Sequence, residues 1–252
     1  MKQAKKTSNS INFADAIAPL QGLTFHYTEK LFSNKGIPLD DAKKVAFGIL
    51  TDKSYSVKER GVFTNIALLL SDQCDYSAKC VIYRGNTAIS MRSQISFTGS
   101  IFKQVDDMLK YITRLNKTSS TFYCGERIDI SDYPPDTINE IVHNAFVHAD
   151  YSVAESSILA NIYDNRIEFF NPGRLLPNVD KQAILNGISI LRNPKLAKLF
   201  EELKYVSMQG IGIGNIIKSY KGNDFQPTIT CSGDSFLISI PNRNYNKKLK
   251  LT

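Results

Sequence analysis

The spacing of hydrophobic residues changes along this chain, and each spacing predicts one kind of element. Apolar residues recur every three to four positions over 100–115 and over 137–149, which predicts two amphipathic helices. Weaker helical patterns indicate shorter helices at 20–35, from 38 onward, at 180–187, at 194–203 and up to residue 220. Helices are therefore expected along the whole chain.

Alternation of apolar and polar residues, with turn residues between, indicates strands. Segments 157–163 and 166–170 predict one hairpin, closed at Asp164-Asn165, and segments 228–231 and 235–240 predict a second. A further strand covers 79–84, whereas 61–70 is a buried segment whose type the periodicity does not fix. Two helices followed by strands also fit a winged-helix DNA reader, although no basic recognition helix stands out.

Composition places the chain among ordinary globular proteins and adds a basic bias. The 252 residues are 42% hydrophobic and 22% charged, with a formal net charge of +7, which favours contact with phosphates of nucleotides or nucleic acid. A merely soluble cationic surface explains this charge equally well. We expect a polar linker or tail at 1–18, an α+β segment at 19–130, a second domain at 131–241 and a basic tail at 242–252. The polar opening suggests that a further domain precedes it.

Cysteine usage and hydropathy bear on the compartment. The four cysteines are scattered without a C-x-x-C pair, which argues against a zinc site and a disulfide framework and favours a reducing compartment. No apolar run approaches the length of a membrane span. We therefore expect a cytoplasmic protein without a membrane partner.

The helix predicted over 137–149 carries polar residues in a row. Glu140, Asn144 and His148 are four positions apart, so they share one helix face beside the apolar stripe. This row is either part of a site or a solvated helix edge. Thr137 and Glu140 also fit a capping box, which would give Glu140 a purely structural role.

A second informative stretch is Gly210-Ile-Gly212-Ile-Gly214, at the start of a predicted helix. Glycines let the backbone approach a ligand, and free N–H groups at a helix start favour an anion such as phosphate. The stretch is neither a complete dinucleotide-binding fingerprint nor a Walker loop. A flexible loop remains the alternative interpretation.

The order of these features is more informative than each alone. A helix with Glu-x-x-x-Asn precedes a hairpin ending on Asn171-Pro-Gly173, then a Gly-x-Gly stretch opening a helix, then a last hairpin. Over 130–241 the chain resembles the GHKL superfamily of ATP-binding proteins, and within it the RecG-like helicase C-terminal module of bacterial transcriptional regulators. These usually carry an N-terminal Schlafen/AlbA-type domain thought to bind nucleic acid. The resemblance implies an α/β fold, an α+β two-layer sandwich whose mixed sheet has helices on one face, with an N-terminal α+β segment against it.

The resemblance also implies a site for ATP and Mg²⁺. Asn144 would ligate the metal, Glu140 would act on the attacking water, and Asn171 would accept a hydrogen bond from the adenine amino group. Residues 174–195 would form a lid. The remaining residues that the resemblance assigns to nucleotide binding are His148, Gly173, Arg192, Asn193, Gly210, Gly212 and Gly214.

Three departures from the family pattern affect hydrolysis more than binding. Asn171 stands in place of an aspartate, Ala149 in place of an arginine, and Arg174 follows Gly173 without a second glycine. We therefore expect an ATP-binding regulatory module of a nucleic-acid-associated protein, with slow Mg²⁺-dependent hydrolysis left open. The alternative is a non-catalytic interaction or dimerisation module. The implied partners are an adenine nucleotide, DNA or RNA mainly through a domain outside this chain, and a second copy in a homodimer.

Overall fold

A six-stranded mixed sheet organises the fold. In the computed structural model the described residues are 13–51, 61–153, 156–173, 176, 182, 184, 190–205, 212–233 and 235–245. Neighbouring strands are antiparallel except β1 and β5, which are parallel. Across the sheet the order is β2 (Met91–Phe97), β1 (Ala78–Tyr83), β5 (Ile158–Ile162), β6 (Arg166–Pro172), β8 (Ser235–Pro241) and β7 (Thr228–Ser232).

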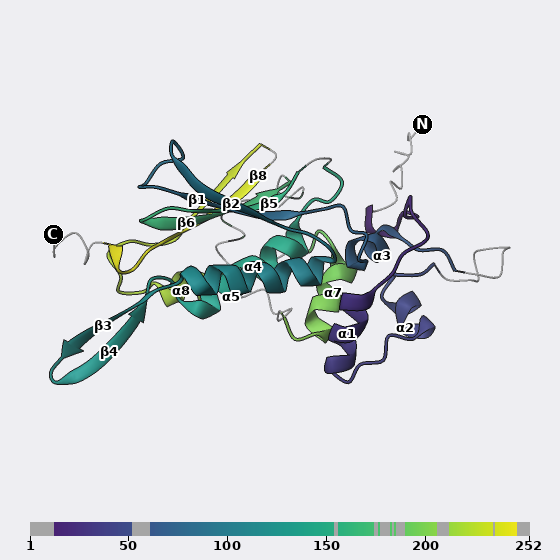
Figure 1. The fold of residues 1–252 in the computed structure, drawn as a ribbon, viewed down its shortest axis with the longest axis horizontal. Helices are drawn as coiled ribbons and strands as arrows, with labels where there is room; N and C mark the ends of the chain where they lie inside the picture. Colours follow the sequence, from purple (N-terminus) through teal and green to yellow (C-terminus); the bar gives the residue numbers. More distant parts are fainter. Residues whose placement is uncertain are drawn as a thin grey trace, which may run out of the picture.

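Helices form a second layer on one face of this sheet (Figure 1). The layer under the strands contains α4 (Ile101–Leu115), α5 (Pro135–His148) and α8 (Gly212–Ser219). Further helical elements whose bounds the structure describes gather beyond one end of α4: η1 (Phe13–Asp15), α1 (His26–Asn34), α2 (Asp41–Ala46), α3 (Asn65–Leu70) and α7 (Pro194–Glu202). The predicted fold class, an α+β two-layer sandwich with helices on one face of a mixed sheet, is confirmed.

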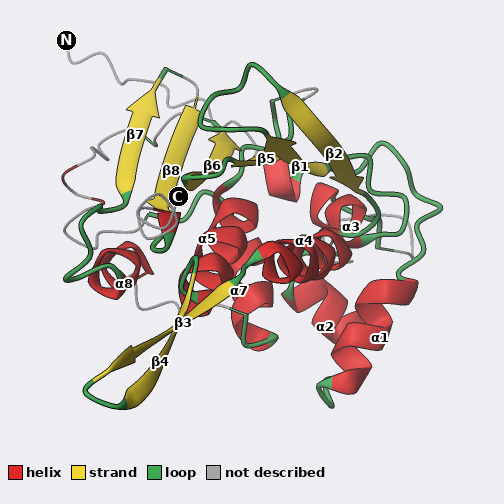
Figure 2. Cartoon of the chain, turned by 60° about the vertical axis from the view of Figure 1, so that its left-hand side comes forward, coloured by secondary structure: helices red, strands yellow, loops and turns green. Residues whose placement is uncertain are grey.

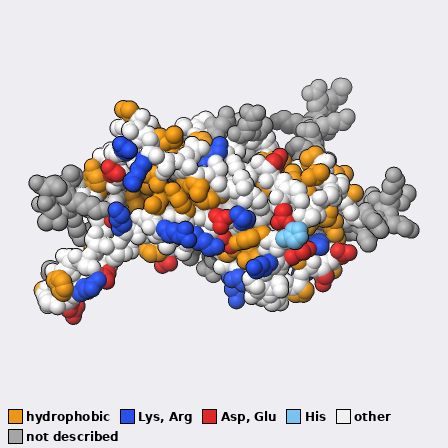
Figure 3. Space-filling view, in the orientation of Figure 1, with side chains coloured by type: hydrophobic (Ala, Val, Ile, Leu, Met, Phe, Trp, Pro, Cys, Tyr) orange, Lys and Arg blue, Asp and Glu red, His pale blue; other side chains and the backbone are white. Residues whose placement is uncertain are grey.

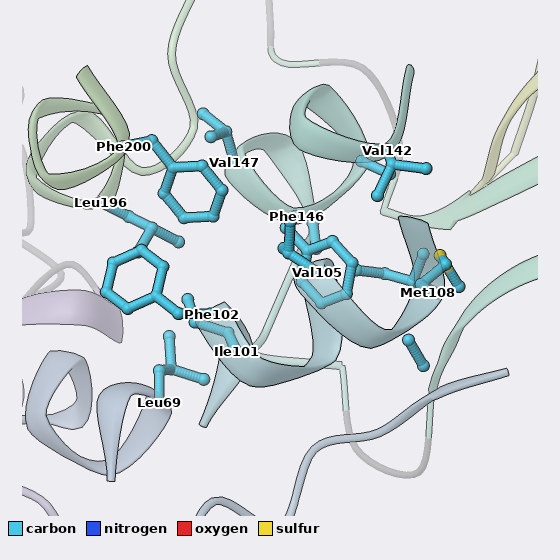
Figure 4. Packing of buried hydrophobic residues seen from close by; sticks show 14 of the residues in the cluster. Leu69, Ile101, Phe102, Val105, Met108, Val142, Phe146, Val147, Leu196 and Phe200 are labelled. Carbon is cyan, nitrogen blue, oxygen red and sulfur yellow. The ribbon is translucent and has the colours of Figure 1, made fainter. Parts of the chain in front are cut away.

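The hydrophobic core lies between these layers and continues into the helical end. Phe102 of α4 packs against Phe200 of α7 at 5.2 Å between ring centroids, while Phe146 of α5 packs in the same cluster (Figure 4). The core draws residues from both sides of position 130, and so does the sheet, because β1 precedes that position and β5 follows it. The two segments expected at 19–130 and 131–241 therefore share one core.

Several local expectations change at the N-terminal side. Residues 13–18 do not lie in a tail, because Ala14 and Ala18 are buried in the core and Ile17 bridges to Thr64. The undecided segment 61–70 contains the buried helix α3. Strand β1 pairs with β5 inside the main sheet, so it is not the wing of a winged-helix domain.

Two described strands form a separate ribbon that the hydrophobic pattern did not predict. β3 (Thr118–Tyr123) and β4 (Glu126–Ser131) pair antiparallel with each other and project from the body (Figures 1 and 2). Their two-residue loop, Cys124-Gly125, has φ values of 50° and 82°, as tight hairpin loops require. Residues 242–245 close the base of this ribbon, where the fully buried Asn244 donates to Ile130 O at 2.9 Å.

Candidate functional site

Helix α5 carries the predicted polar row. It begins before Thr137, whereas a capping box would require Thr137 itself to be the N-cap. Pro134 is the N-cap and Pro135 the first helical residue, so Thr137 lies inside the first turn. The Thr137 hydroxyl instead hydrogen-bonds the Ser219 hydroxyl of α8 at 2.7 Å. Glu140 therefore has no capping role, and α5 is tied to α8 beside it.

Glu140 and Asn144 form the first part of the site. Both side chains are half-buried, and Asn144 Nδ2 donates to Glu140 Oε1 at 3.0 Å. This bond turns the amide so that Asn144 Oδ1 points away from the glutamate, and no described residue donates to that oxygen. A carboxylate and a free amide oxygen are thus presented together.

The first turn of α8 closes against this pair. A Cβ on Gly212 would overlap Glu140 Oε1 and would lie 2.9 Å from Asn144 Nδ2, so only glycine lets the helix approach this far. The first N–H groups of a helix have no partner within it, and the helix dipole makes this end positive. Gly214, by contrast, faces open space. Gly210 lies outside the described residues.

Asn171 lies on the helix-facing side of the sheet, at the end of β6. Ile167 and Phe169 are buried on that side, and Asn171 continues the alternation. Its side chain is only 6% exposed, yet no hydrogen-bond partner for the buried Oδ1 exists in the described structure. A buried acceptor without a partner costs about 1–3 kcal/mol, which suits a position where a ligand supplies the donor.

A tight turn follows, centred on Gly173. Its φ of +106° favours glycine, and a Cβ there would lie 2.5 Å from Asp150 Cβ. The Asp150 N–H donates to Pro172 O at 3.1 Å, and the Asp150 carboxylate pairs with Arg192 Nη1 at 2.7 Å. Arg192 thus lies beside Gly173 and Asp150.

Asn193 has a structural role at the C-terminal end of α5. Its side chain is 4% exposed, and its Nδ2 donates at 2.9 Å to both Val147 O and Ala149 O. The Tyr151 hydroxyl donates to Phe146 O at 2.8 Å. These contacts satisfy the carbonyls that a helix end leaves open, so the Asn193 amide nitrogen is committed to the protein rather than to a phosphate.

His148, the third residue of the predicted row, is half-buried in the last turn of α5. Burial, with a further contribution from the nearby Arg192 charge, lowers the pKa of His148 to about 4. The imidazole is therefore neutral near pH 7. A neutral ring can accept one hydrogen bond and donate one, but it offers no positive charge to a phosphate.

The predicted residues thus fall into two groups along α5. Glu140, Asn144 and Gly212 form one group, and Asn171, Gly173 and Arg192 form the other near the end of the helix. A rise of 1.5 Å per residue places Glu140 about 12 Å along α5 from His148, in the last turn. Most of the predicted lid, 174–195, lies outside the described residues. Asp150, for which the sequence predicts no role, holds the second group together through its contacts with Gly173 and Arg192.

Comparisons with known proteins agree with this architecture. Residues 155–240 match the family described as "Putative ATP-dependent DNA helicase recG C-terminal", which confirms the RecG-like resemblance over that segment. The matched segment includes Asn171, Gly173 and Gly212, whereas Glu140 and Asn144 precede it.

A solved structure extends the likeness to nearly the whole fold. The DIP2311 protein from Corynebacterium diphtheriae superposes with a TM-score of 0.75 at 16% identity, over 92% of this chain and 48% of that one. The chain therefore spans about half the length of this structural relative. No curated protein sequence matches the chain significantly. No helix among the described residues is long and apolar enough to cross a membrane.

Proposed function

We propose that this chain is an ATP-binding module, with Mg²⁺-ATP held between α5, the end of β6 and the start of α8. The observation that carries the proposal is the approach of Gly212 to the Glu140–Asn144 pair, so close that a Cβ on Gly212 would overlap Glu140 Oε1. This arrangement brings an acidic side chain, an amide oxygen and a positive helix end to one point. Such a combination suits a phosphate group with its metal ion.

Asn144 is the residue that would hold the metal. Mg²⁺ prefers oxygen ligands and usually keeps several waters, so one or two protein ligands together with phosphate oxygens are enough. Asn144 Oδ1 meets this requirement because no described residue donates to it, while its Nδ2 is fixed by Glu140. The N–H groups in the first turn of α8 would contact phosphate oxygens.

Glu140 is the candidate general base. Bound ATP would supply a phosphoryl group for transfer to water. Glu140 Oε1 already accepts from Asn144, so the carboxylate has a defined direction and its other oxygen can accept a proton from a water molecule. ATP hydrolysis by Glu140 is a separate proposal, and ATP can bind at this site whether or not it is hydrolysed.

Asn171 would recognise the base. Its buried Oδ1 has no hydrogen-bond partner in the described structure and can accept from the amino group of adenine. Gly173 contributes by letting the turn pack against Asp150, which holds Asn171 at this position. An amide also carries a donor, so Asn171 can turn its Nδ2 toward the oxygen of a 6-oxo purine. We therefore propose purine selectivity with a smaller preference for adenine than a carboxylate would give.

The cellular role that fits is nucleotide-controlled regulation of a DNA- or RNA-associated protein. The description of the matching family as a DNA helicase region and the net charge of +7 support this role. The solved relative is about twice as long as this chain, which leaves room for a separate nucleic-acid-binding domain. Gel shifts at rising salt test whether this chain contributes, because phosphate contacts weaken steeply with salt.

Thermal unfolding with Mg²⁺-ATP tests the core of the proposal. Ligand at about 100 times its dissociation constant should stabilise the protein by about 2.7 kcal/mol. Asn144→Ala should lose the magnesium-dependent part of this shift, whereas Asn139→Ala, at an exposed position on the same helix, should keep it. If millimolar ATP, ADP and GTP all leave the wild-type melting temperature unchanged, ATP binding is refuted.

Phosphate release separates the catalytic proposal from a non-catalytic module. Wild-type turnover that disappears in Glu140→Gln, with the ATP-induced thermal shift retained, would support Glu140 as base. ATP binding without turnover in the wild type would favour the interaction or dimerisation module, which the neutral Asn171 already suits.

A further inference from the structure

The β3–β4 ribbon exposes apolar side chains and lacks the burial that usually stabilises a hairpin. Phe122 is 75% exposed and Ile128 40% exposed, and among described residues the two strands pair only with each other. An isolated two-stranded ribbon is at best marginally stable in water, and its unpaired edges present free N–H and C=O groups. Figure 2 shows the ribbon directed away from both layers. These features indicate a binding element whose partner is another polypeptide edge.

The charges of the ribbon argue against a nucleic-acid partner. Residues 118–131 contain Arg127 as their only basic residue, against Glu126 and Asp129. Figure 3 shows charges of both signs together with apolar side chains on this projection. A polyanion would find no net attraction here, whereas a surface of mixed sign can complement a copy of itself.

The register of the hairpin determines which edge groups are free. A two-residue loop makes the closing pair, Tyr123 and Glu126, a hydrogen-bonded pair, and pairs then alternate along the ribbon. Glu126 and Ile128 therefore direct their backbone groups toward β3. Arg127 and Asp129 direct theirs to the free edge of β4.

We propose that β4 pairs antiparallel with β4 of a second copy, about a two-fold axis through Ile128. In this register Arg127 is paired with the partner's Asp129, and Asp129 is paired with the partner's Arg127. Both are hydrogen-bonded pairs. Ile128 faces Ile128 of the partner subunit as the close, non-hydrogen-bonded pair. The result is a continuous four-stranded sheet in the order β3, β4, β4, β3.

The side chains agree with this register. Directly opposite residues lie on one face, so each arginine faces an aspartate, a favourable cross-strand pair. Within one chain Arg127 Nε already lies 2.9 Å from Asp129 Oδ1, and both side chains are exposed, so they can form a four-membered charge cluster with the partner. The two isoleucines meet on the opposite face. A two-fold axis requires this self-complementarity.

The base of the ribbon sets the length of the pairing. Arg243 Nε donates to Ser131 O at 3.1 Å, which occupies the free edge at that residue. Pairing is therefore confined to about residues 126–130. Such a short interface predicts a reversible dimer that forms with rising concentration rather than a permanent one.

Charge reversal in the full-length chain tests the register. Sedimentation or light scattering should show the mass rising with concentration from 28.3 kDa toward twice that value. Arg127→Asp or Asp129→Arg alone should weaken association at least about tenfold, because like charges then face each other. The double variant restores opposite charges and should restore the dimer. A monomer at all concentrations, or a dimer that ignores both single changes, would overturn the proposal.

Cross-linking locates the axis. In a Cys124→Ser background, Ile128→Cys should form an intermolecular disulfide on mild oxidation, since Cα atoms of a non-hydrogen-bonded pair lie about 4.5 Å apart. Thr121→Cys is the matched control. Thr121 lies on β3, opposite Ile128 of β4, but three strand spacings, about 14 Å, would separate it from Thr121 of the partner subunit. Equal cross-linking at both positions would contradict the register.

A binding experiment tests the other class of partner. If the chain binds DNA or RNA in a salt-sensitive way and Arg127→Ala loses this binding, the ribbon is a nucleic-acid contact and the dimer proposal is wrong.

Discussion

Gly212 lies so close to Glu140 that a single added methyl group would occupy the position of the carboxylate oxygen. The contact joins the first turn of α8 to the second turn of α5. The neighbouring Thr137–Ser219 hydrogen bond at 2.7 Å holds the same two helices together. The position of Glu140 therefore depends on a residue 72 positions later in the chain.

Gly212→Ala should impair nucleotide binding and turnover more than stability. The obstructed atom is the end of a flexible side chain, so Glu140 can turn away, but it then loses its bond with Asn144. We expect a change in unfolding free energy of no more than about 1–3 kcal/mol and loss of most of the ATP-induced thermal shift. Gly214→Ala is the control, because its Cβ meets nothing within 4 Å. Equal effects of both variants on stability would contradict the close approach.

Glu140→Gln and Glu140→Ala should differ in how strongly they bind Mg²⁺-ATP. Glutamine can still accept from Asn144 Nδ2 through its amide oxygen, whereas alanine leaves Asn144 free to rotate. Both should abolish turnover if Glu140 is the base, but only Glu140→Ala should also weaken Mg²⁺-ATP binding. Isothermal titration with ATP, with and without magnesium, provides the measurement. Turnover retained in Glu140→Gln would exclude the base role.

The predictable parts of this fold are those with a buried face. The helix over 100–115 and both hairpins of the main sheet follow from periodicity, because one side of each packs on the core. β2 and the β3–β4 ribbon escaped prediction because nearly all their residues are exposed, so no apolar alternation marks them. A strand without a buried face has no alternation of apolar and polar residues by which the sequence could reveal it.

The candidate site shows a similar limit. Spacing on one helix places Glu140 beside Asn144, but it cannot reveal that Asp150 pairs with Arg192, 42 positions later. Local rules also compete: Thr137 and Glu140 fit a capping box, yet Pro134 and Pro135 begin the helix earlier. The sequence likewise does not show that Asn193 is used to cap α5.

Asn171→Asp should sharpen base selectivity. A carboxylate accepts from the 6-amino group of adenine but repels the 6-oxo group of guanine, whereas the wild-type amide can serve either by turning. We expect the wild type to bind ATP and GTP within about tenfold of each other, and the variant to favour ATP by at least about tenfold more. Competition binding with ATP, GTP and CTP measures this. A variant with an unchanged ATP-to-GTP ratio would show that Asn171 does not contact the base.

The Asp150–Arg192 pair should stabilise the turn at Gly173. Both side chains are about four-fifths buried, so the pair is screened less than a surface pair. A double-mutant cycle with Asp150→Asn and Arg192→Gln should give a coupling of about 1–2 kcal/mol. The Lys103–Asp107 pair on α4, whose side chains are about twice as exposed, is the control and should give about 0.3–0.5 kcal/mol. Equal couplings would mean that burial adds nothing to the Asp150–Arg192 contact.

Acid should destabilise this protein through His143 before most carboxylates titrate. The ring is 7% exposed and stacks on Tyr205 at 5.0 Å, and its buried Nε2 has no hydrogen-bond partner in the described structure. Burial lowers the pKa of His143 from 6.5 to about 4, although the Asp106 charge opposes this shift.

The sign of the effect follows from these values. Between about pH 6.5 and 4 the unfolded chain takes up a proton that the folded protein refuses, so stability present above pH 6.5 is lost as the pH falls. The slope is at most about 1.4 kcal/mol per pH unit for one histidine. His148, with its pKa likewise lowered to about 4, adds a second contribution of the same sign.

His143→Phe should flatten this dependence, because phenylalanine keeps an aromatic ring against Tyr205 and has no proton to bind. Urea unfolding at pH 7.5, 6.0 and 5.0 should show a smaller loss of stability in the variant than in the wild type. An unchanged pH dependence in His143→Phe would mean that the folded protein admits the proton at His143 without cost.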